Sequence, residues 1–294
     1  MYQPATAIAP PLPQVETGSL RVRALTRDSE NEVLAFFAAH PLDTVVMAGL
    51  IHDNGLVSPL NRGTFYACRD EAGQLQGVAL IGHITMIETR SEAALEAFAQ
   101  LAQGFERTHV ILGEQERVAR FWDFYAQGGQ PKRLLCRELL FEQRWPVEVR
   151  EAVKLRPATL DDIELVLPVH ARIAFEECGV NPMEKDPAGF RQRTARRIEQ
   201  GRVWVWIEDG QLIFKADIIS ETPQAMYLEG IYVRAEDRGK GYGQRCLSQL
   251  SRDLLQRTRS ICLLANEQNR AALSLYQKTG YKRRGSYDTI YLQQ

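Results

Sequence analysis

Strand-like and helix-like patterns of apolar residues alternate along the chain, and the same order of elements occurs twice. In the first half, residues 20–26 and 64–88 have the alternation of β-strands, and residues 137–143 predict a further strand that closes this half. Residues 27–40 and 91–103 have the spacing of amphipathic helices. This mixture predicts an α/β unit with a mixed sheet.

The second half repeats the pattern of the first. Three pairs of segments correspond, namely 20–37 with 153–170, 65–81 with 203–219, and 117–129 with 269–281. The repeat is too long for a solenoid and suits two copies of one domain. We therefore expect a flexible arm at residues 1–19, a first domain at 20–145 and a second domain at 152–294.

One segment differs sharply between the copies. The second copy has "EDRGKGYGQR" (236–245) between a strand and a helix, whereas the first copy has "ETRSEAALEA" (88–97), which predicts an ordinary helix with Ser91 as its N-cap. Bare backbone amides before a helix N-terminus suit a phosphate, and Arg238, Lys240 and Arg245 can add positive charge. A flexible surface turn is the alternative reading of the glycines.

Composition excludes several classes of protein. The chain of 294 residues has a net charge of -1, which argues against a general nucleic-acid binder, and it has no apolar run long enough for a membrane span. Its five cysteines are scattered, which suits free thiols in the cytoplasm. The histidines show no metal-ligand spacing, so we expect no metal. The first residues do not have the pattern of a secretory signal.

The glycine segment carries a family resemblance. Residues 238–243, "RGKGYG", fit the [QR]-x-x-G-x-[GA] signature of the GCN5-related N-acetyltransferases, the GNAT superfamily. Asn269, Leu275-Tyr276 and Gly280-Tyr281 follow in the order that this family shows. The resemblance covers residues 153–292. The whole chain looks like a bacterial tandem acetyltransferase whose first domain is degenerate, with two acyl-CoA N-acyltransferase-like folds.

The resemblance implies acetyl-CoA as the cofactor. In this family the signature loop holds the pyrophosphate, and the preceding strand splays from its neighbour to pair with the pantetheine arm. Gly230 within that strand is consistent with a bulge at the splay. The cofactor-binding residues that the resemblance implies are Ile231, Tyr232, Val233, Arg238, Gly239, Lys240, Gly241, Tyr242, Gly243, Gln244, Asn269 and Tyr276.

Two residues are candidates for proton transfer. By resemblance Tyr276 is the general acid that protonates the departing thiolate, although Tyr125 holds the same place in the first copy and suggests a packed aromatic instead. Glu229 precedes the cofactor strand and is a candidate general base for the attacking amine, and the alternative is a solvated strand-end charge. Lys215 is unusual in an apolar strand and shares a strand face with Asp217.

The acceptor is left open by the sequence. Glu176, Glu177 and Asn181 lie in a connection that covers the acceptor site in this family, and two carboxylates there would attract a cationic amine. Solvated helix-end charge is the alternative. A small amine, an amino-acid derivative and a protein lysine all fit an N-acetyltransferase of this kind. The competing reading is a non-catalytic module that binds acyl-CoA or an amino acid as a sensor.

Overall fold

The computed structural model describes residues 15–17, 20–148 and 154–293. Most of the arm predicted at 1–19 and the chain at 149–153 therefore lie outside the described residues. The predicted division into domains at 20–145 and 152–294 stays a prediction. No helix in the described ranges has the length and apolar character needed to cross a membrane.

One mixed sheet runs through the described structure, with the strand order β1-β2-β3-β4-β5-β6-β13-β7-β12-β11-β10-β9-β8. The first half contributes β1 (Val15–Thr17), β2 (Leu20–Ala24), β3 (Gly63–Arg69), β4 (Leu75–Gly82), β5 (Ile84–Thr89), β6 (Val110–Glu114) and β7 (Lys132–Gln143). The second half contributes β8 (Arg156–Pro157), β9 (Val203–Glu208), β10 (Gln211–Glu221), β11 (Met226–Val233), β12 (Ile261–Asn266) and β13 (Lys282–Leu292).

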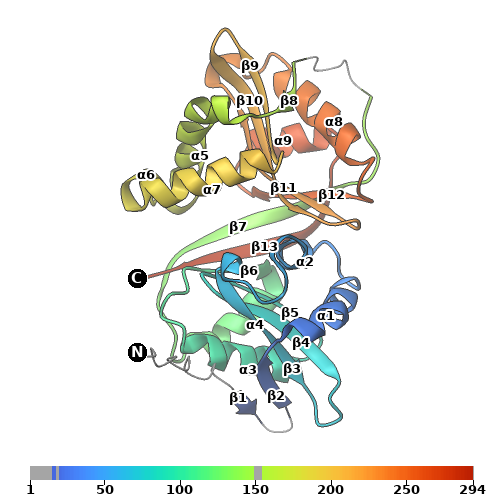
Figure 1. The fold of residues 1–294 in the computed structure, drawn as a ribbon, viewed down its shortest axis with the longest axis vertical. Helices are drawn as coiled ribbons and strands as arrows, with labels where there is room; N and C mark the ends of the chain where they lie inside the picture. The colour runs from blue at the N-terminus through green and yellow to red at the C-terminus, as the bar shows by residue number, and fades with distance from the viewer. Residues whose placement is uncertain (1–14, 18–19, 149–153, 294) are drawn as a thin grey trace, which may run out of the picture.

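The two halves exchange their last strands at the centre of the sheet. β7 of the first half lies between β12 and β13 of the second half, and β13 pairs with β6 of the first half on its other edge. Figure 1 shows β7 and β13 crossing the middle of the molecule. The prediction that residues 137–143 close the first half is therefore wrong, because this segment completes the sheet of the second half.

Helices cover both faces of the sheet in each half (Figure 1). The first half has α1 (Glu30–Phe37), α2 (Val45–Asn54), α3 (Glu92–Gln103) and α4 (Gln115–Tyr125). The second half has α5 (Ile163–Cys178), α6 (Pro182–Lys185), α7 (Pro187–Glu199), α8 (Tyr242–Leu254) and α9 (Arg270–Lys278). Ser91 caps α3 as predicted, since its hydroxyl accepts a hydrogen bond from the amide of Ala94 at 3.0 Å.

Helix α2 ties the halves together. It packs on β10, where the hydroxyl of Ser220 donates to the carbonyl of Val45 at 2.5 Å. Gly49 allows this approach, because a Cβ there would lie 1.8 Å from the hydroxyl oxygen of Ser220. At the end of the same helix, Asp53 forms an ion pair with Arg202. The halves therefore share a sheet, a helix contact and an ion pair.

Candidate active site

A cleft of about 1040 Å³ lies on the second half, at the end of β11. Its walls come from β11, the glycine segment, the start of α9 and the end of α5. Strands of the first half also reach it, through Ile84, Val110, Leu112, Leu134, Cys136 and Glu138. The strand exchange thus brings both halves of the chain to one cavity.

The cleft opens where two parallel strands separate. β11 pairs with β12 only from Met226 to Leu228, so the backbone after Leu228 has no partner on that side. On its other side β11 continues to pair with β10, with a shift in register opposite Gly230. Gly230 has a φ of +61°, which suits a bulge. The bulge and splay predicted from the sequence are confirmed.

A buried ion pair lies beneath the bulge. The ammonium of Lys215, which is fully buried, donates to the carboxylate of Asp217 at 2.7 Å and to the carbonyl oxygen of Gly230 at 3.0 Å. Each residue is held by β10, and their side chains share one face of that strand. The predicted relation between Lys215 and Asp217 is thus an ion pair that also fixes the backbone of the bulge.

Two further basic side chains lie beside Asp217, although burial lowers the pKa of His170. His170 Nε2 lies 2.9 Å and Arg197 Nη1 lies 3.6 Å from the same carboxylate oxygen, Oδ2. Burial by itself would raise the pKa of Asp217, but Lys215, His170 and Arg197 outweigh burial and hold that pKa below its usual range. Burial lowers the pKa of Lys215. Asp217 is therefore an anion that anchors the floor of the site.

The glycine segment forms a cradle of backbone between β11 and α8. Gly239 and Gly241 adopt φ values of +78° and +83°, in the left-handed region that favours glycine, and a Cβ at either position would meet open space. Gly243 lies close to Val233, since a Cβ there would be 3.0 Å from that side chain. The backbone just before α8 and at its start therefore lines the cleft at three positions that carry no side chain, Gly239, Gly241 and Gly243.

The charged residues of this segment have different places. The carboxylate of Asp237 forms ion pairs with Arg234 and with Lys240, whose ammonium lies 2.9 Å away. Lys240 is outside the cleft lining, whereas Arg238 lines the cleft and donates through Nε to the carbonyl of Val233 at 3.2 Å. Asp237 thus stabilises the loop, and Arg238 supplies positive charge to the cleft.

The other predicted cofactor residues gather around the same cavity. Ile231, Tyr232, Val233, Gly239, Gly241, Tyr242, Gly243, Gln244, Asn269 and Tyr276 all line it. Asn269 caps α9, where its side-chain oxygen accepts from the amide of Ala272 at 3.1 Å. The structure therefore brings every predicted cofactor residue except Lys240 to one cleft.

Tyr276 differs from its counterpart in the first half. It is buried, packs with ring centroids 5.8 Å from Phe141, and still lines the cleft. Tyr125 is fully buried, and its hydroxyl accepts a hydrogen bond from the amide of Gln130 at 3.3 Å. Burial raises the pKa of Tyr276, with a further contribution from Glu177, so the phenol stays protonated at neutral pH. Of this pair, only Tyr276 lines the cleft.

Three carboxylates line the far part of the cleft, Glu229 on β11, Glu177 at the end of α5 and Glu138 on β7. Loss of hydration raises the pKa of Glu229, although the carboxyl faces the open cleft and Arg197 opposes the shift. Glu177 is exposed to the open cleft, but loss of hydration there and the charges of Glu229 and Glu138 raise its pKa to about 8. Sequence reasoning missed Glu138, because β7 belongs to the other half.

The remaining predicted acceptor residues are less central. Glu176 lines the cleft but lies 3.8 Å from Arg172 as an exposed ion pair. Asn181 lies outside the cleft lining and caps the short helix α6, where its side-chain oxygen accepts from the amide of Met183 at 3.0 Å. Asn181 therefore has a structural contact that accounts for it without a substrate.

Residues 199–283 match the family model of the acetyltransferase (GNAT) domain. This part of the second half is similar to a GNAT domain. The match spans β9 to the start of β13 and so includes the bulge, the glycine segment and the walls of the cleft that come from β11, α8 and α9. No curated protein matches the chain in sequence.

Solved structures show the same fold over nearly the whole chain. A GNAT-family acetyltransferase from Colwellia psychrerythraea is 12% identical with a TM-score of 0.56, and the alignment covers 92% of this chain and 99% of the other. A tandem GNAT protein from the clavulanic acid biosynthesis pathway is 14% identical with a TM-score of 0.55, and covers 92% and 98%. A Drosophila protein is 14% identical with a TM-score of 0.64, and covers 92% and 98%. The chain therefore has the fold of a tandem GNAT protein.

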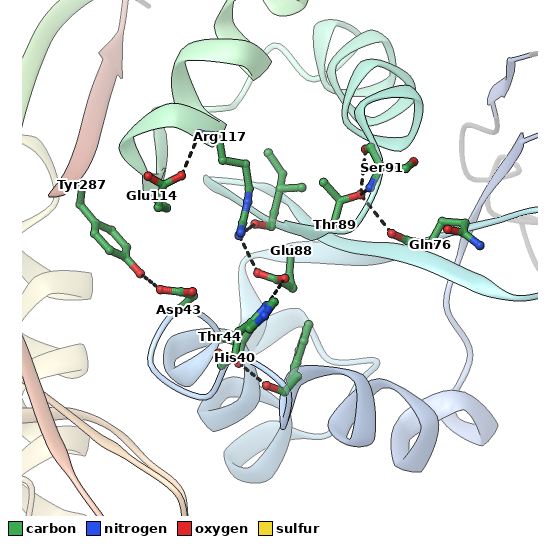
Figure 2. A network of polar contacts seen from close by, with 12 residues as sticks. His40, Asp43, Thr44, Gln76, Glu88, Thr89, Ser91, Glu114, Arg117 and Tyr287 are labelled. Carbon is green, nitrogen blue, oxygen red and sulfur yellow. Dashed lines mark hydrogen bonds and ion pairs between the residues drawn. The ribbon is translucent and has the colours of Figure 1, made fainter. Parts of the chain in front are cut away.

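The first half has a buried ion-pair network near the place that the glycine loop occupies in the GNAT domain. Figure 2 shows Glu88, at the end of β5, between Arg117 of α4 and His40. Glu88 is 2% exposed, and its oxygens lie 2.5 Å from Arg117 Nη1 and 2.8 Å from His40 Nδ1. An internal carboxylate here repels a phosphate.

The same network includes the group of potential metal ligands found among the described residues, His40, Asp43 and Glu88. Both oxygens of Glu88 already have partners, and one partner is the guanidinium of Arg117 (Figure 2). A guanidinium bonded to the same carboxylate opposes a metal cation. Asp43 accepts a hydrogen bond from the hydroxyl of Tyr287 on β13. The network thus suits a structural role that ties β13 to the first half.

Proposed function

We propose that this protein is an acetyl-CoA-dependent N-acetyltransferase whose second half transfers an acetyl group to a primary amine. One observation carries the proposal. The unpaired backbone edge of β11 after Leu228 faces the same cleft as the glycine cradle at the start of α8, and Glu229 and Tyr276 line that cleft. This is one continuous surface with a place for phosphate, for an extended arm and for proton transfer.

The residues present suit acetyl-CoA. The amides near Gly239 and Gly241, with Arg238 beside them, would hold the pyrophosphate. The free edge of residues 229–233 would hold the amide groups of the pantetheine arm as a neighbouring strand would. In the first half, the ordinary helix α3 with its Ser91 cap stands in place of the glycine segment, and buried Glu88 lies just before it, so we expect one cofactor for each chain.

The chain's own residues would move the protons. Acetyl-CoA would supply a thioester, at which the amine nitrogen forms the new bond to the acetyl carbon while the bond to sulfur breaks. Glu229 would accept the proton that the amine loses, and its raised pKa makes it a better base than an ordinary carboxylate near neutral pH. Tyr276, held protonated by burial, would give a proton to the departing sulfur.

The test is turnover of acetyl-CoA with a panel of primary amines. The release of free thiol measures the rate. We expect an amine-dependent rate that Glu229→Gln lowers at neutral pH, with partial recovery at high pH where the amine is already neutral. Cofactor binding should survive this change. A protein that binds acetyl-CoA but releases no thiol with any amine would be the non-catalytic sensor instead.

A further inference from the structure

The carboxylates of the cleft lack partners that would neutralise them. Among the residues that the structure describes, no basic side-chain nitrogen lies within 4.0 Å of the carboxylate oxygens of Glu138, Glu177 or Glu229. Glu138 accepts one hydrogen bond, from the hydroxyl of Thr289 at 2.6 Å. Three acidic groups in one cavity therefore repel one another, and the charges of Glu138 and Glu229 both act on Glu177.

The nearby cations are already engaged. Arg197 and Lys215 surround Asp217, and Arg172 pairs with Glu176 and lies 5.0 Å from the ring of Tyr232. Arg238 lines the cleft beside the glycine cradle, where it donates to the backbone of Val233. The acidic end of the cleft thus holds three carboxyl groups that no described cation pairs directly, although Arg197 and Lys215 act on Glu229 from farther away.

A second observation points to a ligand at the same place. Tyr227 is 8% exposed, lines the cleft, and lies close enough to Glu229, Glu138 and Glu177 for their charges to raise its pKa after burial does. Within the described part of the chain its hydroxyl has no hydrogen-bond partner. Because Tyr227 lines the cleft and no described protein group bonds its hydroxyl, this oxygen can accept a hydrogen bond from a donor in the cleft.

We propose that the acceptor is an aliphatic amine with a second positive charge, a diamine or polyamine, whose distal ammonium is held by Glu138 and Glu177 while its reacting nitrogen lies at Glu229. This rests on the proposed function of the second half. An amine with one positive charge would leave Glu138 and Glu177 without a cation. An amino acid would add its own carboxylate to a pocket that is already acidic. The hydroxyl of Tyr227 provides an acceptor for an ammonium N–H.

The proposal also gives the first half a role in substrate choice. Glu138 reaches the cleft because β7 pairs with β12, where Glu138 lies opposite Asn266. The first half would therefore bind no cofactor of its own but would supply one wall of the acceptor site. The strand exchange would then be part of the substrate site as well as of the fold.

Three probes of equal chain length test the proposal, namely cadaverine, pentylamine and δ-aminovalerate. They share one primary amine and end in an ammonium, a methyl group and a carboxylate. We expect kcat/KM to fall in that order, by at least about tenfold at each step, because a charge-assisted contact has roughly that effect. Glu138→Gln should lower kcat/KM for cadaverine about tenfold and leave pentylamine nearly unchanged. Glu164→Gln is the control, because Glu164 lies at the exposed start of the same helix α5 as Glu177.

Calorimetric binding of cadaverine separates this proposal from the proposed function. Binding that Glu138→Gln or Glu177→Gln weakens supports the acceptor class even if no thiol is released, and in that case the proposed transfer fails by itself. Equal kcat/KM for the three probes, or absence of cadaverine binding, overturns the acceptor class. Turnover of another amine would then still support acetyl transfer.

Discussion

The ammonium of Lys215 donates a hydrogen bond to the carbonyl oxygen of Gly230, 3.0 Å away, in the interior of the second half. Gly230 lies at the bulge where β11 leaves β12, so this contact fixes the start of the backbone edge that we assign to the cofactor. A Cβ at Gly230 would lie 2.8 Å from the ammonium, so glycine is needed for the contact. A buried charge thus sets the geometry of an open strand edge.

Replacing this lysine should cost both stability and cofactor affinity. Lys215→Met leaves the bulge without its donor and removes the closest cation from buried Asp217, which should lower the free energy of unfolding by about 3 kcal/mol. Lys154→Met is the matched control, because Lys154 pairs with Glu208 at the surface, where solvent weakens the pair, so its loss should cost much less. Urea unfolding measures the stability of both variants. Equal losses for the two variants would contradict the account.

Tyr276 should matter for turnover more than for binding. Tyr276→Phe keeps the packing against Phe141 and removes the hydroxyl, so kcat should fall by about a hundredfold or more while the Kd for CoA is unchanged. Tyr125→Phe is the control, since Tyr125 holds the same place in the first half and is fully buried. An unchanged kcat for Tyr276→Phe across the pH range would leave this residue as packing alone.

Glu177 should make the protein less stable as the pH rises. Its pKa is raised from 4.5 to about 8 in the folded state, so the folded protein holds a proton that the unfolded chain releases. Stability from this group is present at low pH and is lost as the pH rises through about 8. Glu177→Gln should make the fall in Tm between pH 5 and 8 less steep, and calorimetry at several pH values in this range measures it.

Glu164→Gln should leave that slope as it is. Arg191 lowers the pKa of Glu164, so this carboxyl has finished titrating below the range in question. Glu138 and Glu229 have raised pKa values as well and should preserve part of the slope in the Glu177 variant. A slope that Glu177→Gln does not change would show that this carboxyl titrates normally.

The second half should not fold alone. A fragment of residues 150–294 lacks β7, which pairs with β12 on one edge and with β13 on the other. Without β7 the sheet of this half has a gap at its centre, and the apolar side chains of β12 lose Leu140 and Phe141 as neighbours. We expect no cooperative thermal transition for the fragment, in contrast to the full chain. A sharp transition would mean that β13 can take the place of β7.

The sequence predicts the cofactor end of the site well, for local reasons. Gly239 and Gly241 adopt positive φ, and in the first half Ser91 caps a helix in the same local way, since each of these depends on neighbouring residues only. The resemblance to the family then supplies the order in which the loop and the Tyr276 helix meet. These features can be predicted from the sequence because the type of the residue itself sets the local conformation.

The acceptor end could not be read in the same way. Glu138 is one polar residue in a strand of alternating pattern, and that pattern would fit the sheet of either half. Its place in the cleft depends on long-range pairing of β7 with β12. Helix α2 was also missed, because Val45–Asn54 is apolar on most sides and has little amphipathic pattern. Both features are decided by contacts between the halves.

The most direct test of the account is calorimetric titration of the full chain with CoA. We predict one site for each chain, and Gly241→Asp should weaken binding by at least about a hundredfold, because it brings a carboxylate against the pyrophosphate. Gly201→Asp is the matched control, since Gly201 has a φ of +69°, has open space around its Cβ position and lies outside the cleft lining. Two sites for each chain, or normal binding by Gly241→Asp, would contradict the account.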